Sequence, residues 1–194
     1  MPRLSTLYLL AYNSLQAIGW TFSLLAILIN LLSTRSVAGT YASSGKLISL
    51  LQCTAVLEVI HGAIGIVPSG VLLTLMQWGG RVHFLLAVVD KVHEVQGSPS
   101  VFITLLAWSI SEVIRYSHYA FNCIGSCPPW ITYLRYTGFI VLYPLGIGPG
   151  ESESLSTFPC FYLLFPYEFA IHIGIATHSF LYFPLTSFSM FCIN

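Results

Sequence analysis

The sequence predicts an all-α membrane protein, and three observations lead to that fold class. Hydrophobic residues make up 56% of the 194 residues and charged residues only 7%, with a mean hydropathy of +0.80, whereas about a quarter of a soluble domain is charged. The chain contains several mostly apolar runs near the roughly 20 residues that a helix needs to cross a bilayer. Clusters of Gly, Pro and Ser separate these runs. We therefore predict a polytopic bundle of about six transmembrane helices, forming a single membrane domain over residues 1–194.

The first three spans are predicted in the N-terminal half of the chain. Tyr8–Leu32 is too long for the apolar core of a signal peptide, which has about 7–15 residues, so we expect a first span that stays in the chain. Ile48–Ile66 is interrupted by one glutamate and one histidine. Val71–Val89 carries two glycines and an arginine in its middle, which makes it less regular.

Three further spans are predicted after them, at Val101–Ile124, Trp130–Ile147 and Cys160–Phe183. Prolines weaken the sixth as a straight helix. The predicted connectors are "STRSVAGTYASSGK" (Ser33–Lys46), "VPSG", "DKVHEVQGSPS" and "GSCPP". Lys and Arg show no asymmetry between these connectors, so the positive-inside rule assigns no orientation.

The charged residues and the cysteines exclude some classes of function. Seven Lys and Arg balance seven Asp and Glu, with no basic run, so nucleic acid binding is not expected. The five cysteines show no paired ligand spacing, and most lie in apolar runs, where cysteine behaves as a small hydrophobic residue. We predict neither a metal site nor a disulfide framework.

Two pairs of ionisable residues fall inside predicted spans. Glu58 and His61 are three residues apart, so they share one face of a helix. Glu112 and Arg115 have the same spacing, and Tyr116 lies close to that face, as does the next tyrosine along the helix. Ionisable groups at membrane depth are costly, so they either mark function or pair with one another. Both interpretations remain open for each pair.

The stretch "HGAIGIVPS" has the layout of the His-Cys-x5-Arg phosphate loop of tyrosine phosphatases. In that loop a thiolate attacks phosphorus and an arginine holds the phosphate oxygens. Gly62 stands here at the nucleophile and Pro68 at the arginine. Neither residue can perform that chemistry, so phosphatase activity is excluded.

The region from Tyr143 to Glu151 breaks the fifth span with two prolines and three glycines. Irregular backbone at membrane depth is tolerated where it is buried in protein or lines a cavity, which predicts a pocket. Poor solvation raises the pKa of a carboxyl group toward the range of a general base, and a tyrosine hydroxyl can donate a proton. A base and a phenol are what the elimination of water from a β-hydroxy carbonyl compound requires. The alternative is an interfacial tyrosine and a solvated loop glutamate.

Four stretches together resemble one family: "YLLAYNSLQAIGW", "LQCTAVLEVIHGAIGIVPSG", "LLAWSISEVIRYSHYAF" and "LRYTGFIVLYPLGIGPGE". The family is the very-long-chain (3R)-3-hydroxyacyl-CoA dehydratases, once called protein tyrosine phosphatase-like, and in particular its plant PASTICCINO-type members. The resemblance runs from about Leu7 to Glu151, in the family's order. It implies a six-helix protein of the endoplasmic reticulum membrane with both termini cytosolic. The implied reaction is the dehydration of 3-hydroxyacyl-CoA to trans-2-enoyl-CoA in fatty acid elongation.

The resemblance also implies roles for individual residues. The family's catalytic tyrosine falls on Tyr143 and its catalytic glutamate on Glu151. Glu151 would take the C2 proton while Tyr143 assists the departure of the C3 hydroxyl, or the two roles are exchanged. Arg115 and Arg135 would orient the pocket or meet the CoA phosphates. The alternative is that they cap helix ends or, for Arg115, pair with Glu112.

The chain departs from the family pattern in two places. Most members place the catalytic pair seven residues apart, whereas Tyr143 and Glu151 are separated by eight. A loop at "GIGPG" can absorb the extra residue, and Glu153 is a less favoured substitute for Glu151. After Glu151 the family-like region ends, and residues 152–194 form a divergent segment rich in Phe, Ser and Pro, with no basic residue.

The expected partners follow from the implied reaction. They are a long-chain 3-hydroxyacyl-CoA substrate, the lipid bilayer, and the elongase and reductase of the same cycle. We expect no cofactor, because dehydration moves no electrons. The rival hypothesis is a catalytically inactive membrane scaffold that binds other elongation-cycle proteins. A small-solute carrier ranks last, because the sequence shows neither an aligned polar path nor an inverted repeat.

Overall fold

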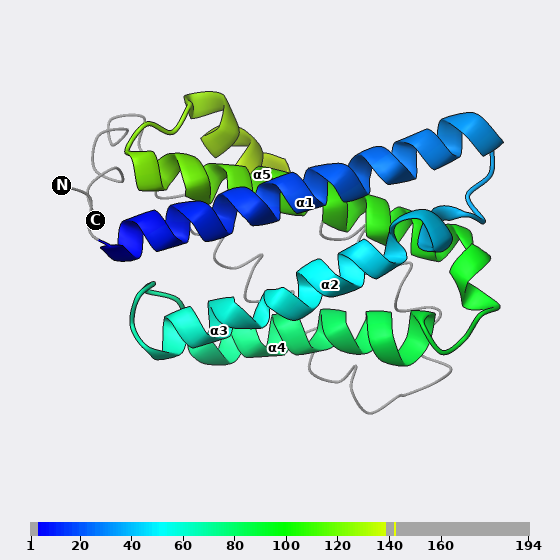
Figure 1. Cartoon of the computed structure of the whole chain (residues 1–194), viewed down its shortest axis with the longest axis horizontal. Coiled ribbons are helices and arrows are strands. Elements are labelled where there is room, and N and C mark those ends of the chain that lie inside the picture. The colour runs from blue at the N-terminus through cyan, green and yellow to red at the C-terminus, as the bar shows by residue number, and fades with distance from the viewer. Residues whose placement is uncertain (1–3, 139–141, 143–194) are drawn as a thin grey trace.

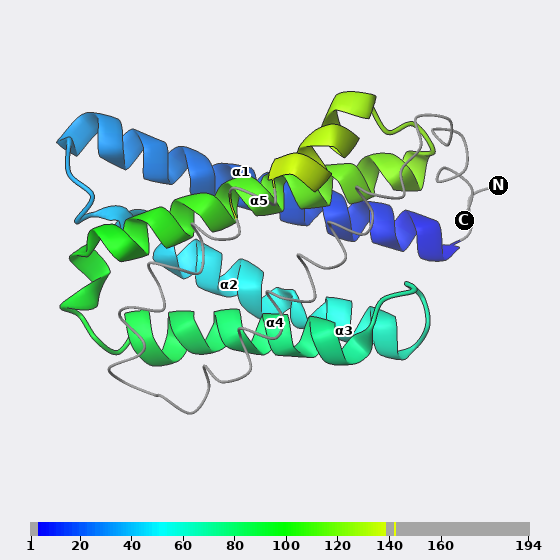
Figure 2. The ribbon, with the colours of Figure 1, turned by 180° about the vertical axis from the view of Figure 1, so that it is seen from behind.

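The computed structural model describes residues 4–138 and Leu142, and the regular structure of this part is helical throughout. The long helices α1 (Leu4–Thr34) and α5 (Pro99–Ile124) lie side by side along most of their length (Figure 1). A second pair packs beside them, formed by the α2–α3 segment and α4, as the view from behind also shows (Figure 2). A further short helix covers residues 129–138 after α5.

The second and third passes through the bundle are each built from consecutive helical pieces. The elements are η1 (Tyr41–Gly45, a π-helix), α2 (Lys46–Thr54), α3 (Val56–Ala63), α4 (Val71–His83), η2 (Phe84–Val89, a π-helix) and η3 (Val95–Gly97, a 3-10 helix). The α2–α3 segment and α4 lie next to each other, on one side of the α1 and α5 pair (Figure 1).

Three helical stretches in the described part are long and apolar enough to cross a membrane: Leu4–Thr34, Tyr41–Ala63 and Val71–Val89. The first contains the predicted span Tyr8–Leu32, and the third has the predicted bounds, so the irregular middle of that span does not break it. The protein is therefore an all-helical protein with three candidate membrane spans in this part of the chain. A count of six spans stays a prediction.

The predicted connector Ser33–Lys46 is non-helical only over residues 35–39, and the second span begins at Tyr41, so the predicted start of that span at Ile48 was wrong. The hydroxyls of Ser43 and Ser44 donate to the carbonyl of Thr40 at 2.9 and 2.8 Å. Small polar residues therefore meet their hydrogen-bonding needs within the helix, although serine often favours loops. The buried ring of Tyr41 anchors this end of the span, because its hydroxyl donates to Asp90 at 3.1 Å.

α5 confirms a helix at the fourth predicted span, Val101–Ile124, and local signals fix both of its ends. The Ser98 side chain accepts from the N–H of Val101, and a proline occupies the first helical position. Gly125 ends the helix in the left-handed conformation, with φ of 75°. The fifth predicted span begins as the helix over residues 129–138, whereas the remainder of it and the sixth span, Cys160–Phe183, lie outside the described residues apart from Leu142.

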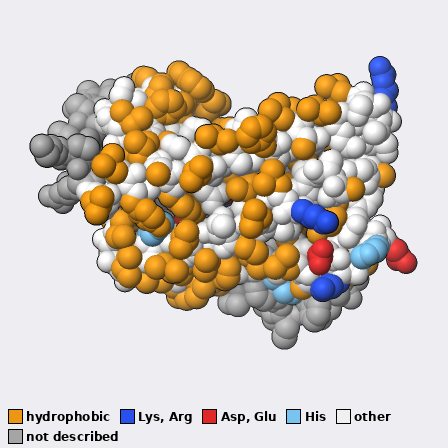
Figure 3. All heavy atoms as spheres, viewed as in Figure 1, with side chains coloured by type: hydrophobic (Ala, Val, Ile, Leu, Met, Phe, Trp, Pro, Cys, Tyr) orange, Lys and Arg blue, Asp and Glu red, His pale blue; other side chains and the backbone are white. Residues whose placement is uncertain are grey.

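The distribution of polar residues on α1 is the reverse of that in a soluble helix. Its inward face includes Gln16 and Ser23, which are 3% and 0% exposed, whereas Leu15 and Phe22 are 69% and 62% exposed. A soluble protein would not present such large apolar side chains along one face of a long helix. Hydrophobic side chains cover most of the face seen in Figure 3, and charged side chains gather toward one end of the bundle. The interior is therefore the place where polar groups of this bundle meet.

Candidate functional site

Four ionisable side chains from three helices form a continuous ion-pair chain inside the bundle, in the order Arg81, Glu112, Arg115 and Glu58. The Arg115 guanidinium donates to both oxygens of Glu58, from Nη1 at 2.6 Å and from Nη2 at 3.1 Å. Its Nε donates to Glu112 at 2.6 Å. Arg81 from α4 donates to the other oxygen of Glu112. The alternating charges cancel, which is what burial at membrane depth requires.

The ion pair within α5 was predicted from the sequence, whereas the ion pairs between helices were not. Glu112 and Arg115 are three residues apart and form the predicted ion pair. The second carboxylate of the chain, Glu58, comes from α3 and completes the arginine's bidentate contact. Arg81 is the member that sequence reasoning missed, because it was read as an interruption of the third span. The signal was available, since an arginine inside an apolar run must find a partner.

Two tyrosines complete the surroundings of Glu58. Tyr116, 1% exposed, donates its hydroxyl to Oε1 of Glu58. Tyr12 reaches the same oxygen from α1 at 3.4 Å. Gln16, one turn further along α1, donates to the Tyr12 hydroxyl at 3.3 Å and to Thr54 at 2.9 Å. The carboxylate of Glu58 thus connects α3 to both α1 and α5.

His61 lies beside this network. Its Nε2 is 2.9 Å from the hydroxyl of Tyr8, and its ring meets the rings of Tyr8 and Tyr12 edge-on, each at 5.3 Å between centroids. The shared helix face predicted for Glu58 and His61 therefore brings both side chains to Tyr12. Glu58 nevertheless forms its ion pair with Arg115.

The contacts of the two carboxylates limit the chemistry that this cluster can perform. Glu112 is 1% exposed and is held by two guanidinium groups, while Glu58 accepts from one guanidinium and two phenols. A general base needs a lone pair that can reach the substrate's proton. The cluster is therefore suited to fixing the positions of four helices, and it is poorly suited to proton abstraction.

Changing Tyr116 to phenylalanine tests how much its hydrogen bond to Glu58 contributes to stability, compared with that of Tyr12. We expect Tyr116→Phe to lower the free energy of unfolding by about 1.5–3 kcal/mol, since a hydrogen bond to a charged acceptor is lost. Tyr12→Phe is the matched control and should cost clearly less, because its hydroxyl is 3.4 Å from the same oxygen and Gln16, its other partner, still donates to Thr54. Denaturant titration of the detergent-solubilised protein measures both. If both variants lowered the free energy of unfolding equally, the stronger contribution assigned to the Tyr116 hydrogen bond would be contradicted.

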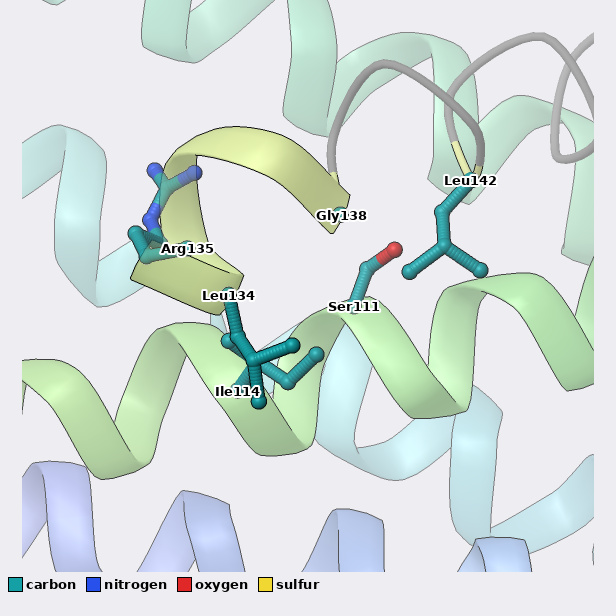
Figure 4. A pocket seen from close by; sticks show the side chains of 6 residues that line it. All are labelled: Ser111, Ile114, Leu134, Arg135, Gly138 and Leu142. Carbon is teal, nitrogen blue, oxygen red and sulfur yellow. The ribbon is translucent and has the colours of Figure 1, made fainter. Parts of the chain in front are cut away.

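A small cleft lies on another side of α5, between that helix and residues 129–138 (Figure 4). Its lining residues are Ser111, Ile114, Leu134, Arg135, Gly138 and Leu142. Two guanidinium groups lie near the ring of Tyr119, with Cζ of Arg115 at 5.8 Å and Cζ of Arg135 at 5.9 Å from its centroid. Arg135 also donates to the Tyr119 hydroxyl at 3.5 Å. Tyr119 thus links the ion-pair chain to the cleft.

The structure brings together most of the supporting residues that the sequence suggested. Glu58, Glu112, Arg115 and Tyr116 form one network, His61 borders it, and Arg135 stands at the cleft. The catalytic pair expected from the resemblance, Tyr143 and Glu151, lies outside the described residues. Among the described residues, no three His, Cys, Asp or Glu side chains are grouped to hold a metal ion. The cysteines in this part, Cys53, Cys123 and Cys127, are free.

Comparison with known proteins decides the family. Residues 52–193 match the family described as protein tyrosine phosphatase-like protein, PTPLA. The chain belongs to this family. The matched range includes the residues after the expected catalytic glutamate as well as α3, α4 and α5.

Members of the PTPLA family with curated names resemble the chain over about three quarters of its length. The human very-long-chain (3R)-3-hydroxyacyl-CoA dehydratase 2 is 42% identical over 144 residues, which cover 74% of this chain and 57% of the human protein. The Caenorhabditis elegans protein very-long-chain (3R)-3-hydroxyacyl-CoA dehydratase hpo-8 is 39% identical over 149 residues, 76% of this chain and 68% of its own. A probable dehydratase of the same name from Schizosaccharomyces pombe is 35% identical over 142 residues, covering 73% and 68%.

The chain matches only part of the length of these relatives, and this limits the conclusions about its function. The chain spans little more than half the length of the human dehydratase that it matches. No solved structure matches the chain. Family membership is therefore established, and the activity of the whole protein is a matter for a proposal.

Proposed function

We propose that this protein is a hydro-lyase that dehydrates (3R)-3-hydroxyacyl-CoA to trans-2-enoyl-CoA in very-long-chain fatty acid elongation. The observation that carries the proposal is that relatives from three organisms, each named for this activity, match 73–76% of the chain. The sequence retains the tyrosine and glutamate of the family's motif at Tyr143 and Glu151. The apolar helices are consistent with a substrate that carries a long acyl chain.

Tyr143 and Glu151 are the groups to which we assign the chemistry. Glu151 removes the proton from C2, and the electron pair of that C–H bond forms the C2–C3 double bond. The C3–O bond breaks, and Tyr143 supplies a proton to the departing hydroxyl, which leaves as water. The two carboxylates of the ion-pair chain are poor alternatives, because Glu58 and Glu112 are both engaged by arginine.

Arg135 is assigned to the polar part of the substrate. Among the described residues, Arg81 and Arg115 each hold a carboxylate, whereas the Arg135 contacts are with the phenol and ring of Tyr119. A guanidinium without a carboxylate partner in a cleft is suited to phosphate or to a carbonyl oxygen. We therefore assign Arg135 to the CoA end of the substrate, with the acyl chain directed between the helices.

The membrane and the partners follow from the same proposal. We propose that the protein resides in the endoplasmic reticulum membrane as a multi-pass protein and that it works beside the elongase and the reductase of the elongation cycle. The substrate of one enzyme in that cycle is the product of another, and each carries a long acyl chain that partitions into the bilayer. Neighbouring enzymes would shorten the path between successive steps.

The direct test measures turnover by the purified protein in detergent. Long-chain (3R)-3-hydroxyacyl-CoA is supplied, and the enoyl-CoA product is measured by mass spectrometry, with the (3S) isomer as the control. Formation of trans-2-enoyl-CoA from the (3R) isomer supports the proposal. A folded protein that binds elongase or reductase but forms no enoyl-CoA would contradict it and favour the inactive scaffold.

A further inference from the structure

We infer that Ser111, on the cleft side of α5, is a substrate-positioning residue that donates a hydrogen bond to the thioester carbonyl of the acyl-CoA. The inference rests on the proposed dehydratase function and gives a role to a residue that lies in one of the family-like stretches but received no role from the resemblance. Three features of the described residues carry it: the state of the Ser111 hydroxyl, the composition of the cleft, and the place of the cleft along the chain.

The Ser111 hydroxyl is available for a ligand. Two serines within the long helices donate to the carbonyl four residues earlier: Ser109 to Leu105 at 2.8 Å and Ser23 to Gly19 at 3.2 Å. Within the described part of the chain, the Ser111 hydroxyl has no hydrogen-bond partner. Figure 4 shows it pointing from α5 toward the gap between Gly138 and Leu142.

The lining of the cleft around this hydroxyl matches the chemical character of the reacting end of an acyl thioester. Ile114, Leu134 and Leu142 give it apolar walls, and Arg135 lies at one end with its guanidinium turned away from the Ser111 hydroxyl, toward Tyr119 (Figure 4). An acyl thioester has the matching character, since an alkyl chain adjoins a polar carbonyl and a phosphate-bearing head. A polar donor within apolar walls also fixes the orientation of a bound group.

The cleft is next to the proposed chemistry along the chain. Leu142, which lines it, immediately precedes Tyr143 in the sequence. When the C2 proton leaves, negative charge develops on the thioester carbonyl oxygen. A hydrogen bond from a fixed donor to that oxygen strengthens as the charge grows, and this lowers the barrier. The Ser111 hydroxyl keeps its own proton throughout, so the step needs no further reactant.

The first test compares Ser111→Ala with Ser111→Thr and with Ser109→Ala. We expect Ser111→Ala to lower kcat/KM for dehydration at least about ten-fold, because one donor to the developing charge is lost. Ser111→Thr keeps the hydroxyl and should retain most of the activity. Ser109→Ala removes a neighbouring helix hydroxyl that is already engaged within α5, and it should leave kcat/KM near that of the unmodified protein.

The second test fills the cleft without touching the hydroxyl. A Cβ at Gly138 would lie 3.7 Å from Leu142 and 3.9 Å from Ile114, which are ordinary contacts, so alanine fits and leucine fills the space. We expect Gly138→Leu to lower kcat/KM at least about ten-fold and Gly138→Ala to have a smaller effect. Gly79→Leu is the control, because a Cβ at Gly79 meets no atom within 4 Å. Size-exclusion chromatography in detergent establishes that each variant is folded.

The outcomes separate this inference from the proposed function. If the unmodified protein dehydrates its substrate and Ser111→Ala is as active as Ser109→Ala, the role of Ser111 is refuted and the dehydratase function stands. If Gly138→Leu is as active as Gly79→Leu, the cleft does not hold the substrate. A fold-change specific to Ser111→Ala and Gly138→Leu supports the inference. An inactive unmodified protein refutes the proposed function, and the role of Ser111 with it.

Discussion

Replacing Glu151 by alanine is expected to lower kcat for dehydration by about 10²–10⁴-fold, because that is the usual contribution of a positioned general base. Tyr143→Phe removes a single hydroxyl and is expected to lower kcat over the same range. Both variants should keep KM within a few-fold of the unmodified value, since the acyl chain and the CoA head provide most of the binding energy. Steady-state kinetics with a long-chain (3R)-3-hydroxyacyl-CoA measures both constants.

Glu153→Ala is the matched control for Glu151→Ala, because it removes the same group two residues further along. It should retain nearly full activity. If Glu153→Ala lost activity and Glu151→Ala kept it, the base would be Glu153. If both kept activity, the carboxylate of this region would not be the base at all.

The helices of the described part could largely be predicted from the sequence, because apolar runs of membrane length leave few alternatives. The third span was found with its observed bounds despite the two glycines and Arg81 in its middle. The error lay at the start of the second span, where "YASSGK" resembles a connector. A run of small polar residues carries no information about hydroxyls that bond back to helix carbonyls, or about a tyrosine that will be buried.

The candidate site could be predicted in part, and the limit is physical. The spacing of Glu112 and Arg115 gave their ion pair, because contacts within one helix follow from its geometry. The contacts of Arg115 with Glu58 and of Arg81 with Glu112 join residues 57 and 31 positions apart. Such contacts depend on how helices pack, so the sequence indicates that each charge needs a partner without naming it. The sequence likewise could not indicate that the Ser111 hydroxyl faces a cleft, because this also depends on how the helices pack.

Glu112→Ala is expected to be the most destabilising single change in the ion-pair chain. Glu112 is 1% exposed and holds both Arg81 and Arg115. Its removal leaves Arg81, whose side chain is 29% exposed, without the carboxylate that it contacts, and removing one member of a buried ion pair costs about 3–5 kcal/mol. Denaturant titration in detergent should show a loss of that size. Glu94→Ala, at an exposed position in the connector before α5, is the matched control and should change stability by less than about 0.5 kcal/mol.

A double variant distinguishes the loss of charge pairing from the loss of packing. Glu112→Leu combined with Arg81→Met removes one charge of each sign and leaves Glu58 and Arg115 as a single neutral pair. Apolar replacement of both members of a buried pair is often neutral or stabilising. The double variant should therefore recover more than half of the stability that Glu112→Ala loses. If it is as unstable as Glu112→Ala, the loss of stability comes from the lost packing of the Glu112 side chain. The ion pair between Arg81 and Glu112 would then not be what stabilises the helix packing.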